Sequence, residues 1–285
     1  MAAYFCDTDC ELWHTTVKEL GIGVIQMPYT IDGEEYLYDF GEKTDLVGFF
    51  KKMEAGSVAS TSAQNEAYYL NIFEPYFAKG EDILYVSFST KMSSTFNFLD
   101  SAIETLKAKY PGVRFERFDT ESICLGCGIQ VELGARFFNS HNHDIDATIE
   151  YLTKVREHTD MLFVVENLKY LARGGRLSPA KAAIGNFMQV KPILSTKDGE
   201  LNVVAKQNGS KKAMSYVVEQ FASKYQDLDD APVYVLGADC DDVVEELAVK
   251  IKAYCPKANI VNLSIGPVIG AHCGPKTYGV IYTKK

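Results

Sequence analysis

Hydrophobic and polar residues alternate in blocks along the first half of the chain, and the blocks have two different periods. Short apolar runs predict buried strands at residues 22–27, 83–88 and 113–119. Apolar residues at helical spacing predict helices at residues 46–53, 66–77, 95–109 and 125–139. Strands that alternate with helices are typical of a mostly parallel sheet with helices on both faces. Ligands of such sheets bind at the carboxyl ends of the strands.

The second half of the chain has a different order of elements. A helix at residues 146–158 precedes predicted strands at 161–165, 193–195, 201–205, 233–236, 260–263 and 280–282, and helices at 168–172, 210–225 and 243–254. Lys197-Asp198-Gly199 between two of these strands is typical of a hairpin, so this sheet is mixed. We therefore predict two α/β domains, residues 1–157 with the mostly parallel sheet and residues 158–285 with the mixed sheet and its helices.

Composition and charge narrow the classes of function. The chain has 285 residues, of which 47% are hydrophobic, so it is long and apolar enough to fold into a globular protein. No apolar run approaches a membrane span and the first residues lack the features of a signal peptide, so we expect a cytoplasmic protein with at most transient membrane contact. A net charge of −9 argues against nucleic acid as a partner.

Basic residues are concentrated in one segment of this acidic chain. Residues 169–212 contain nine Lys and Arg but only two Asp and Glu, a net charge of +7. Such a segment often forms a surface for a partner or a phosphate, although solvated lysines scattered over a surface are the alternative interpretation.

The cysteines and histidines favour neither a disulfide framework nor a metal site. Seven cysteines are an odd number. Cys124 and Cys127 have the spacing of a redox or zinc pair, but the second pair of a zinc site is missing, and two small residues at the start of a helix are the simpler interpretation. His141 and His143 lie in a polar connecting segment. We predict no metal ion and no cofactor.

Two clusters of hydroxyl side chains stand directly before predicted helices. Ser60-Thr61-Ser62 precedes the helix at 66–77, and Ser93-Ser94-Thr95 leads from the strand at 83–88 into the helix at 95–109. Hydroxyl residues at such places are ordinary N-caps. A helix N-terminus also attracts anions, because its first N–H groups are unpaired and its dipole is positive there. Two such junctions favour one convergent anion site.

A third segment, residues 266–275, combines three glycines and two prolines with His272. This composition predicts an irregular loop whose N–H groups and imidazole approach a small polar ligand. The alternative is a plain turn before the last strand, with His272 as an incidental surface residue.

These segments, in this order, resemble motifs of the DegV family, whose members include the fatty-acid-binding subunits of bacterial fatty acid kinase. The segments that carry the resemblance are Asp7-Thr8-Asp9, Ile31-Asp32-Gly33, Thr61-Ser62, Met92-Ser93-Ser94-Thr95-Phe96-Asn97, Asp119-Thr120-Glu121-Ser122, Arg173-Gly174-Gly175-Arg176 and residues 266–274. The chain departs from the family's usual residues at Ala63, Ser94 and Lys276, so its ligand can differ in detail.

The resemblance implies a long-chain fatty acid held between the two domains, with its carboxylate bound directly by Thr61, Ser93 and His272. The Ser94 amide and the Ser62 hydroxyl would be secondary partners. It further implies a separate kinase subunit that uses ATP to phosphorylate the carboxylate. The chain itself has no nucleotide-binding loop, so we expect a binding subunit and not an enzyme.

Several interpretations stay open at this point. Arg173 and Arg176 could form the docking face for the kinase, or could only fasten the two domains together. Residues 182–188 could cover the acyl chain or belong to the core.

A serine-dependent acyl hydrolase or transferase would use Ser93 as nucleophile and His272 as base, with Asp7 or Asp119 to orient the imidazole. A stand-alone lipid carrier or sensor would need no kinase.

Overall fold

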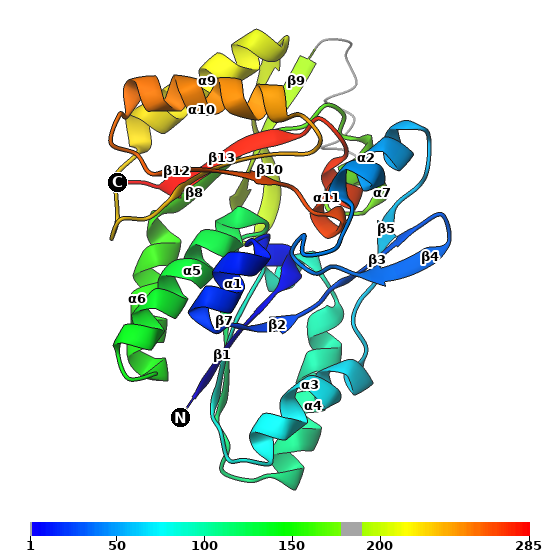
Figure 1. Ribbon diagram of the computed structural model, residues 1–285, viewed down its shortest axis with the longest axis vertical. Helices are drawn as coiled ribbons and strands as arrows, with labels where there is room; N and C mark the ends of the chain where they lie inside the picture. The colour runs from blue at the N-terminus through cyan, green and yellow to red at the C-terminus, as the bar shows by residue number, and fades with distance from the viewer. Residues whose placement is uncertain (1, 178–189) are drawn as a thin grey trace.

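The first sheet is entirely parallel and lies between two layers of helices. The computed structural model describes residues 2–177 and 190–285 (Figure 1). The sheet has the strand order β2-β1-β6-β7, and its strands are β1 (Ala3–Asp7), β2 (Gly23–Ile25), β6 (Ile83–Ser87) and β7 (Phe115–Asp119). Every residue of β6 is buried, as expected for a parallel strand covered on both faces.

Helices cover both faces of this sheet, as the alternating pattern predicts. The helices α3 (Glu66–Phe77) and α4 (Thr95–Lys109) pack against each other on one side. The helices α1 (His14–Leu20), α5 (Leu125–Ser140) and α6 (Ile145–His158) lie on the other (Figure 1). The predicted sheet and its helices are confirmed, except that the sequence-based prediction omits β1 and α1 and makes β2 too long.

The second sheet is mixed and has the strand order β10-β9-β8-β13-β11-β12. Only β11 and β12 pair in parallel, and the other neighbours are antiparallel. The strands are β8 (Thr159–Val164), β9 (Val190–Lys197), β10 (Glu200–Asn208), β11 (Val233–Gly237), β12 (Ile260–Ser264) and β13 (Tyr278–Thr283). Asp198 and Gly199 both have positive φ, so the predicted hairpin between β9 and β10 has the two-residue turn that matches strand twist.

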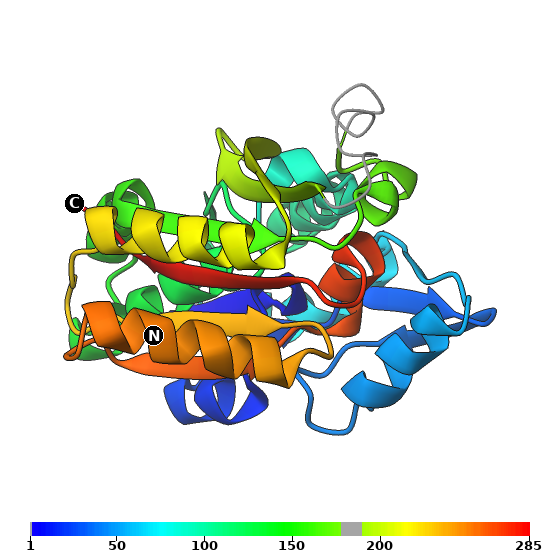
Figure 2. The ribbon, with the colours of Figure 1, turned by 90° about the horizontal axis from the view of Figure 1, so that it is seen from above.

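Helix α5 joins the two sheets into one core. The helices α9 (Ser210–Lys224) and α10 (Asp241–Tyr254) lie side by side over one face of the mixed sheet (Figure 2). On its other face, α5 contacts β8 and β13 as well as β1. Most residues of α5 are therefore buried, and one continuous apolar cluster includes Phe5, Leu125 and Ile281. The division at residue 157 stays a prediction.

A small antiparallel sheet, not predicted from the sequence, completes the fold. Its order is β4-β3-β5, with β3 (Pro28–Ile31), β4 (Glu34–Leu37) and β5 (Ser60–Thr61). The helices α2 (Leu46–Glu54) and α11 (Pro267–Cys273) pack together, and α11 also contacts β3 and β5. A segment from near the end of the chain is thus built into a sheet formed near its beginning.

The predicted loop at residues 266–275 is wrong, because most of it forms α11. Pro267 occupies the first helical turn, where a missing N–H costs nothing, and Gly274 ends the helix with a φ of 79°. Gly266, Pro267, Gly274 and Pro275 therefore mark the two ends of a short helix, whereas Gly270 lies inside it. The segment 182–188 lies outside the described residues. Among the residues that the structure describes, no helix is both long and apolar enough to cross a membrane.

Candidate functional site

A cavity of about 290 Å³ lies where the three sheets and α11 meet. Its walls include residues from the loops after β1, β6 and β7, such as Asp9, Phe88 and Ile123, as expected for a ligand site at the carboxyl ends of parallel strands. All five predicted carboxylate-binding residues line it, namely Thr61, Ser62, Ser93, Ser94 and His272. The structure therefore brings together segments that lie more than 200 residues apart.

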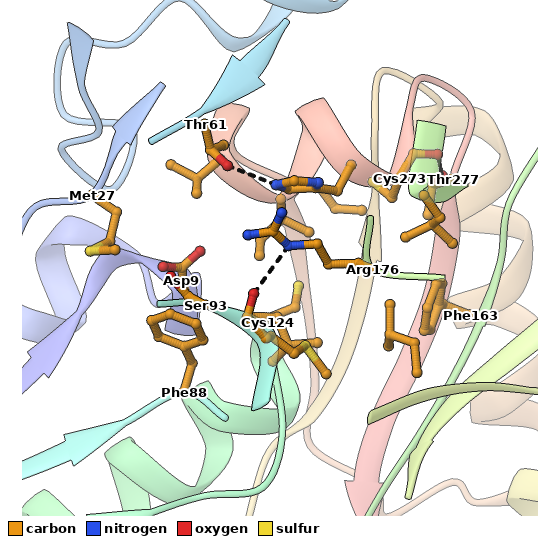
Figure 3. Close-up of a pocket in the computed structure, with 18 of the residues that line it drawn as sticks. Asp9, Met27, Thr61, Phe88, Ser93, Cys124, Phe163, Arg176, Cys273 and Thr277 are labelled. Carbon is orange, nitrogen blue, oxygen red and sulfur yellow. Dashed lines mark hydrogen bonds between the residues drawn. The ribbon is translucent and has the colours of Figure 1, made fainter. Parts of the chain in front are cut away.

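Thr61 and His272 form the contact that joins β5 to α11. The Thr61 Oγ1 lies 2.8 Å from Nε2 of the imidazole (Figure 3). The other ring nitrogen, Nδ1, is buried and has no hydrogen-bond partner among the described residues. It faces Gly174, where a Cβ atom would stand 2.1 Å from it. Only glycine leaves room for the imidazole there.

Burial keeps His272 uncharged near neutral pH. Desolvation lowers the pKa of the imidazole from 6.5 to about 4, and the nearby charges of Arg176 and Arg173 act in the same direction. A neutral imidazole donates from one nitrogen and accepts at the other, so His272 is a hydrogen-bonding group here and not a positive charge.

Ser93 and Ser94 lie between the short 3₁₀ helix η2 (Thr90–Met92) and α4. The Ser93 Oγ accepts a hydrogen bond from the Thr95 N–H at 3.2 Å, which leaves its own proton for another acceptor. Ser94 is the N-cap residue of α4, and its side chain makes no capping bond. The N-terminus of this helix thus reaches the cavity wall.

The hydroxyl residues near α3 are not its caps. Asn65 caps α3 by accepting a hydrogen bond from the Tyr68 N–H at 2.9 Å. Thr61 belongs to β5, and the exposed Ser62 donates its hydroxyl to Glu35 at 3.1 Å. The capping interpretation is therefore wrong for this cluster, and Thr61 is left to bind His272.

The two arginines after β8 have different surroundings. Arg176 follows α7 (Lys169–Arg173) and lines the cavity, where its Nε donates to the Met92 carbonyl at 3.1 Å (Figure 3). It therefore ties the segment after α7 to the segment before α4. Arg173 is exposed, and its guanidinium lies 5.3 Å from the centre of the Tyr170 ring.

Sequence reasoning assigned no role to Asp9, which also lines the cavity. Asp9 is in the 3₁₀ helix η1 (Thr8–Cys10), directly after β1, and is only 5% exposed. Its position follows from β1, the strand that the prediction omits. Had β1 been recognised, an acidic residue at the end of a parallel strand would have been a signal for the site.

The cysteines form no disulfide and no metal site in the described part of the chain. Cys124 and Cys273 line the cavity, and Cys127 is buried in the core. Burial raises the pKa of all three thiols, which disfavours the reactive thiolate. The described residues include no group of three or more His, Cys, Asp or Glu arranged to hold a metal ion.

The side chains of the alternative hydrolase do not assemble into a triad. His272 bonds to Thr61 and not to Ser93. Asp7 accepts its hydrogen bonds from Tyr85 and from two backbone amides, and Asp119 bonds to Thr90 and to the Glu121 N–H. A catalytic imidazole needs a partner that fixes its tautomer, and neither carboxylate serves that purpose here.

Comparison with known proteins places the chain in a family. Residues 3–285 match the family model described as "Uncharacterised protein, DegV family". The chain belongs to the DegV family. It is 32% identical over 279 residues to a DegV domain-containing protein of Clostridium perfringens, covering 98% of this chain and 96% of that protein.

Two solved structures, one of them of a DegV family protein, have the same fold. A DegV family protein of Thermus thermophilus, described as binding fatty acid, has a TM-score of 0.86 at 23% identity, covering 100% of this chain and 99% of that one. A stearic-acid-binding protein of Eubacterium ventriosum has a TM-score of 0.85 at 18% identity, with the same coverage. This DegV chain therefore shares its complete architecture with both.

We predict that the His272 ring titrates near pH 4 in the folded protein, and NMR of the imidazole protons measures this directly. As the pH falls below 6.5, His272 binds a proton in the unfolded chain but not yet in the folded protein, and this difference favours unfolding. The free energy of unfolding should therefore fall by about 3 kcal/mol between pH 6.5 and 4. The variant His272→Gln keeps a partner for Thr61 and should lack this part of the pH dependence. A ring that titrates near 6.5 would contradict the buried, uncharged state.

Proposed function

We propose that this DegV chain binds a long-chain fatty acid in the cavity and presents its carboxylate to an ATP-dependent kinase subunit, which phosphorylates it to an acyl phosphate. The observation that carries the binding part is the chemistry of the cavity wall. Thr61, Ser93 and Arg176 provide polar groups, whereas most other lining residues, such as Phe163 and Ile281, are apolar (Figure 3). The descriptions of the Thermus thermophilus and Eubacterium ventriosum proteins support the same class of ligand.

The head group has a set of suitable partners. A carboxylate accepts about four hydrogen bonds, and each charge-assisted bond contributes about 1.5–3 kcal/mol. Thr61, Ser93 and His272 are the direct partners in this proposal, and the Ser94 amide adds a donor from the start of α4. Ser62 is secondary, because its hydroxyl is engaged with Glu35. Arg176 supplies the positive charge that a buried carboxylate needs.

The acyl chain accounts for most of the affinity. Burial of a methylene group contributes about 0.8 kcal/mol, so about 15 of them give on the order of 12 kcal/mol before the costs of association. Such a ligand leaves slowly into water. Slow release suits a protein that carries an insoluble substrate to another subunit, and it equally suits the alternative of a carrier or sensor without a kinase.

The kinase partner requires an exposed contact surface near the cavity. Arg173 is exposed at the end of α7, three residues before Arg176, within the basic segment. We assign the docking role to Arg173. Arg176 instead donates a hydrogen bond to the Met92 carbonyl, which supports the interpretation that Arg176 fastens the two domains together.

The first test of this function is the ligand itself. The protein purified from bacteria under native conditions should carry fatty acid in about a one-to-one ratio, as measured by mass spectrometry of an organic extract. Ser93→Ala and His272→Ala should each weaken retention by about tenfold to a hundredfold, because each removes a charge-assisted hydrogen bond from the head group.

Ser140→Ala is the matched control, since Ser140 is an exposed serine at the end of α5 and does not line the cavity. Circular dichroism establishes that the variants fold. Purified protein without an acyl chain would contradict the proposed ligand. Unchanged retention in both cavity variants would instead show that the head group binds elsewhere.

The docking assignment has its own test. Arg173→Glu should lower the rate of acyl phosphate formation with a bacterial fatty acid kinase subunit by about tenfold or more, because it reverses a charge at the contact. Retention of fatty acid should stay unchanged. Lys154→Glu, an exposed charge reversal on α6, is the control. Equal rates for the two variants would remove Arg173 from the interface.

A further inference from the structure

Asp9 is a buried carboxyl group that faces the cavity and has no hydrogen-bond partner among the described residues. It is 5% exposed, and no described residue donates a hydrogen bond to its side chain. Figure 3 shows its carboxyl group on the cavity side, directed toward the guanidinium of Arg176. Ser93 lines the same cavity. A buried polar group in this state is costly unless a ligand completes its hydrogen bonds.

The two acidic neighbours of Asp9 in the chain are already engaged in the structure. Asp7 accepts hydrogen bonds from the Tyr85 hydroxyl at 2.8 Å and from the Phe88 N–H at 3.1 Å. One oxygen of Glu11 accepts a hydrogen bond from the Gly266 N–H at 2.8 Å. Neither lines the cavity, so Asp9 alone of the three carboxyl groups is available to a ligand there.

The charges around Asp9 favour its protonated form. Burial raises the pKa of Asp9 well above its usual range, the charges of Asp7 and Glu11 raise it further, and Arg176 opposes them. His272 across the cavity is uncharged near neutral pH and adds no compensating charge. Among the residues that the structure describes, the other titratable groups that face Asp9 are Tyr69 on α3, Tyr85 on β6 and Cys127 on α5.

A fatty acid head group would bring a second carboxyl group to this place. The cavity would then hold two carboxyl groups, with one guanidinium as the only permanent positive charge among the described residues that line it. Two carboxylates in contact at a buried site cannot both stay ionised, and they bind one proton between them.

We propose that Asp9 is a ligand-binding residue that shares one proton with the carboxylate of the bound fatty acid. The proton sits on Asp9 and is donated in a hydrogen bond to a head-group oxygen. At a pH where Asp9 is protonated in the free protein, the proton is already in place and stays there when the ligand leaves. At a higher pH it is taken up from solvent with the ligand and returns to solvent on release. The inference rests on the proposed binding of a fatty acid. It adds that binding requires Asp9 in its protonated form.

The dependence of affinity on pH tests this inference. Dodecanoate, kept below its aggregation range, is titrated into delipidated protein between pH 6 and 10, where the free ligand stays ionised. For the wild type, the Kd should be flat at the low end and then rise toward tenfold per pH unit once Asp9 ionises in the free protein. Calorimetry in buffers of different ionisation enthalpy should then detect nearly one proton taken up per ligand.

Asp9→Asn is the decisive variant, because it keeps the shape and a donor but cannot ionise. Its Kd should lose the rise toward tenfold per pH unit and the uptake of nearly one proton. Only a weaker dependence on pH should remain from Asp7 and Glu11, because burial raises their pKa values to about 7 and about 8. The control Glu11→Gln should keep the one-proton step with a shifted midpoint. Asp9→Ser replaces the first variant if the asparagine protein does not fold.

A wild type that binds with a flat pH profile, or an Asp9→Asn protein that still takes up nearly one proton on binding, overturns this inference alone. A wild type that binds no dodecanoate overturns the proposed function and this inference with it.

Discussion

The hydrogen bond between Thr61 and His272 is the contact on which the site depends. The two residues are 211 positions apart, and their bond holds α11 against β5 at the wall of the cavity. Both elements are short, and neither is stable alone, so the site exists only in the complete fold. Gly174 fits against the other side of the same imidazole, which fixes the ring from two directions.

A second constraint is the balance of charge in the cavity. His272 is uncharged near neutral pH, which leaves Arg176 as the permanent cation on the described part of the wall and Asp9 as the group opposite to it. An anionic head group would therefore meet a site with little spare positive charge. The described wall also offers neutral hydrogen-bonding groups at the start of α4 and on β5.

Much of this architecture could be predicted from the sequence, because local signals and tertiary structure agree. The helices α3 and α4 follow the predicted spacing of apolar residues, and the hairpin at Asp198 has the expected turn. Thr61, Ser93 and His272 line one cavity, as the resemblance to the DegV family implies. Local pattern and family motif together were sufficient for these features.

The remaining features depend on contacts that no short segment specifies. The strand β1 is a run of five residues whose place in the sheet is set by pairing with β2 and β6 on either side. The helix α11 was predicted as a loop, because glycine and proline mark helix ends as well as turns. The place of Asp9 opposite Arg176 follows from the meeting of β1 with the segment after α7. Such a meeting is visible only in three dimensions.

A crystal structure of the protein loaded with a saturated fatty acid tests the central claim most directly. We predict electron density for the carboxylate within hydrogen-bonding distance of Thr61 Oγ1 and Ser93 Oγ, about 2.5–3.2 Å, with the acyl chain running toward Phe163. A carboxylate at the Phe163 end of the cavity, or a ligand bound outside it, would contradict the account.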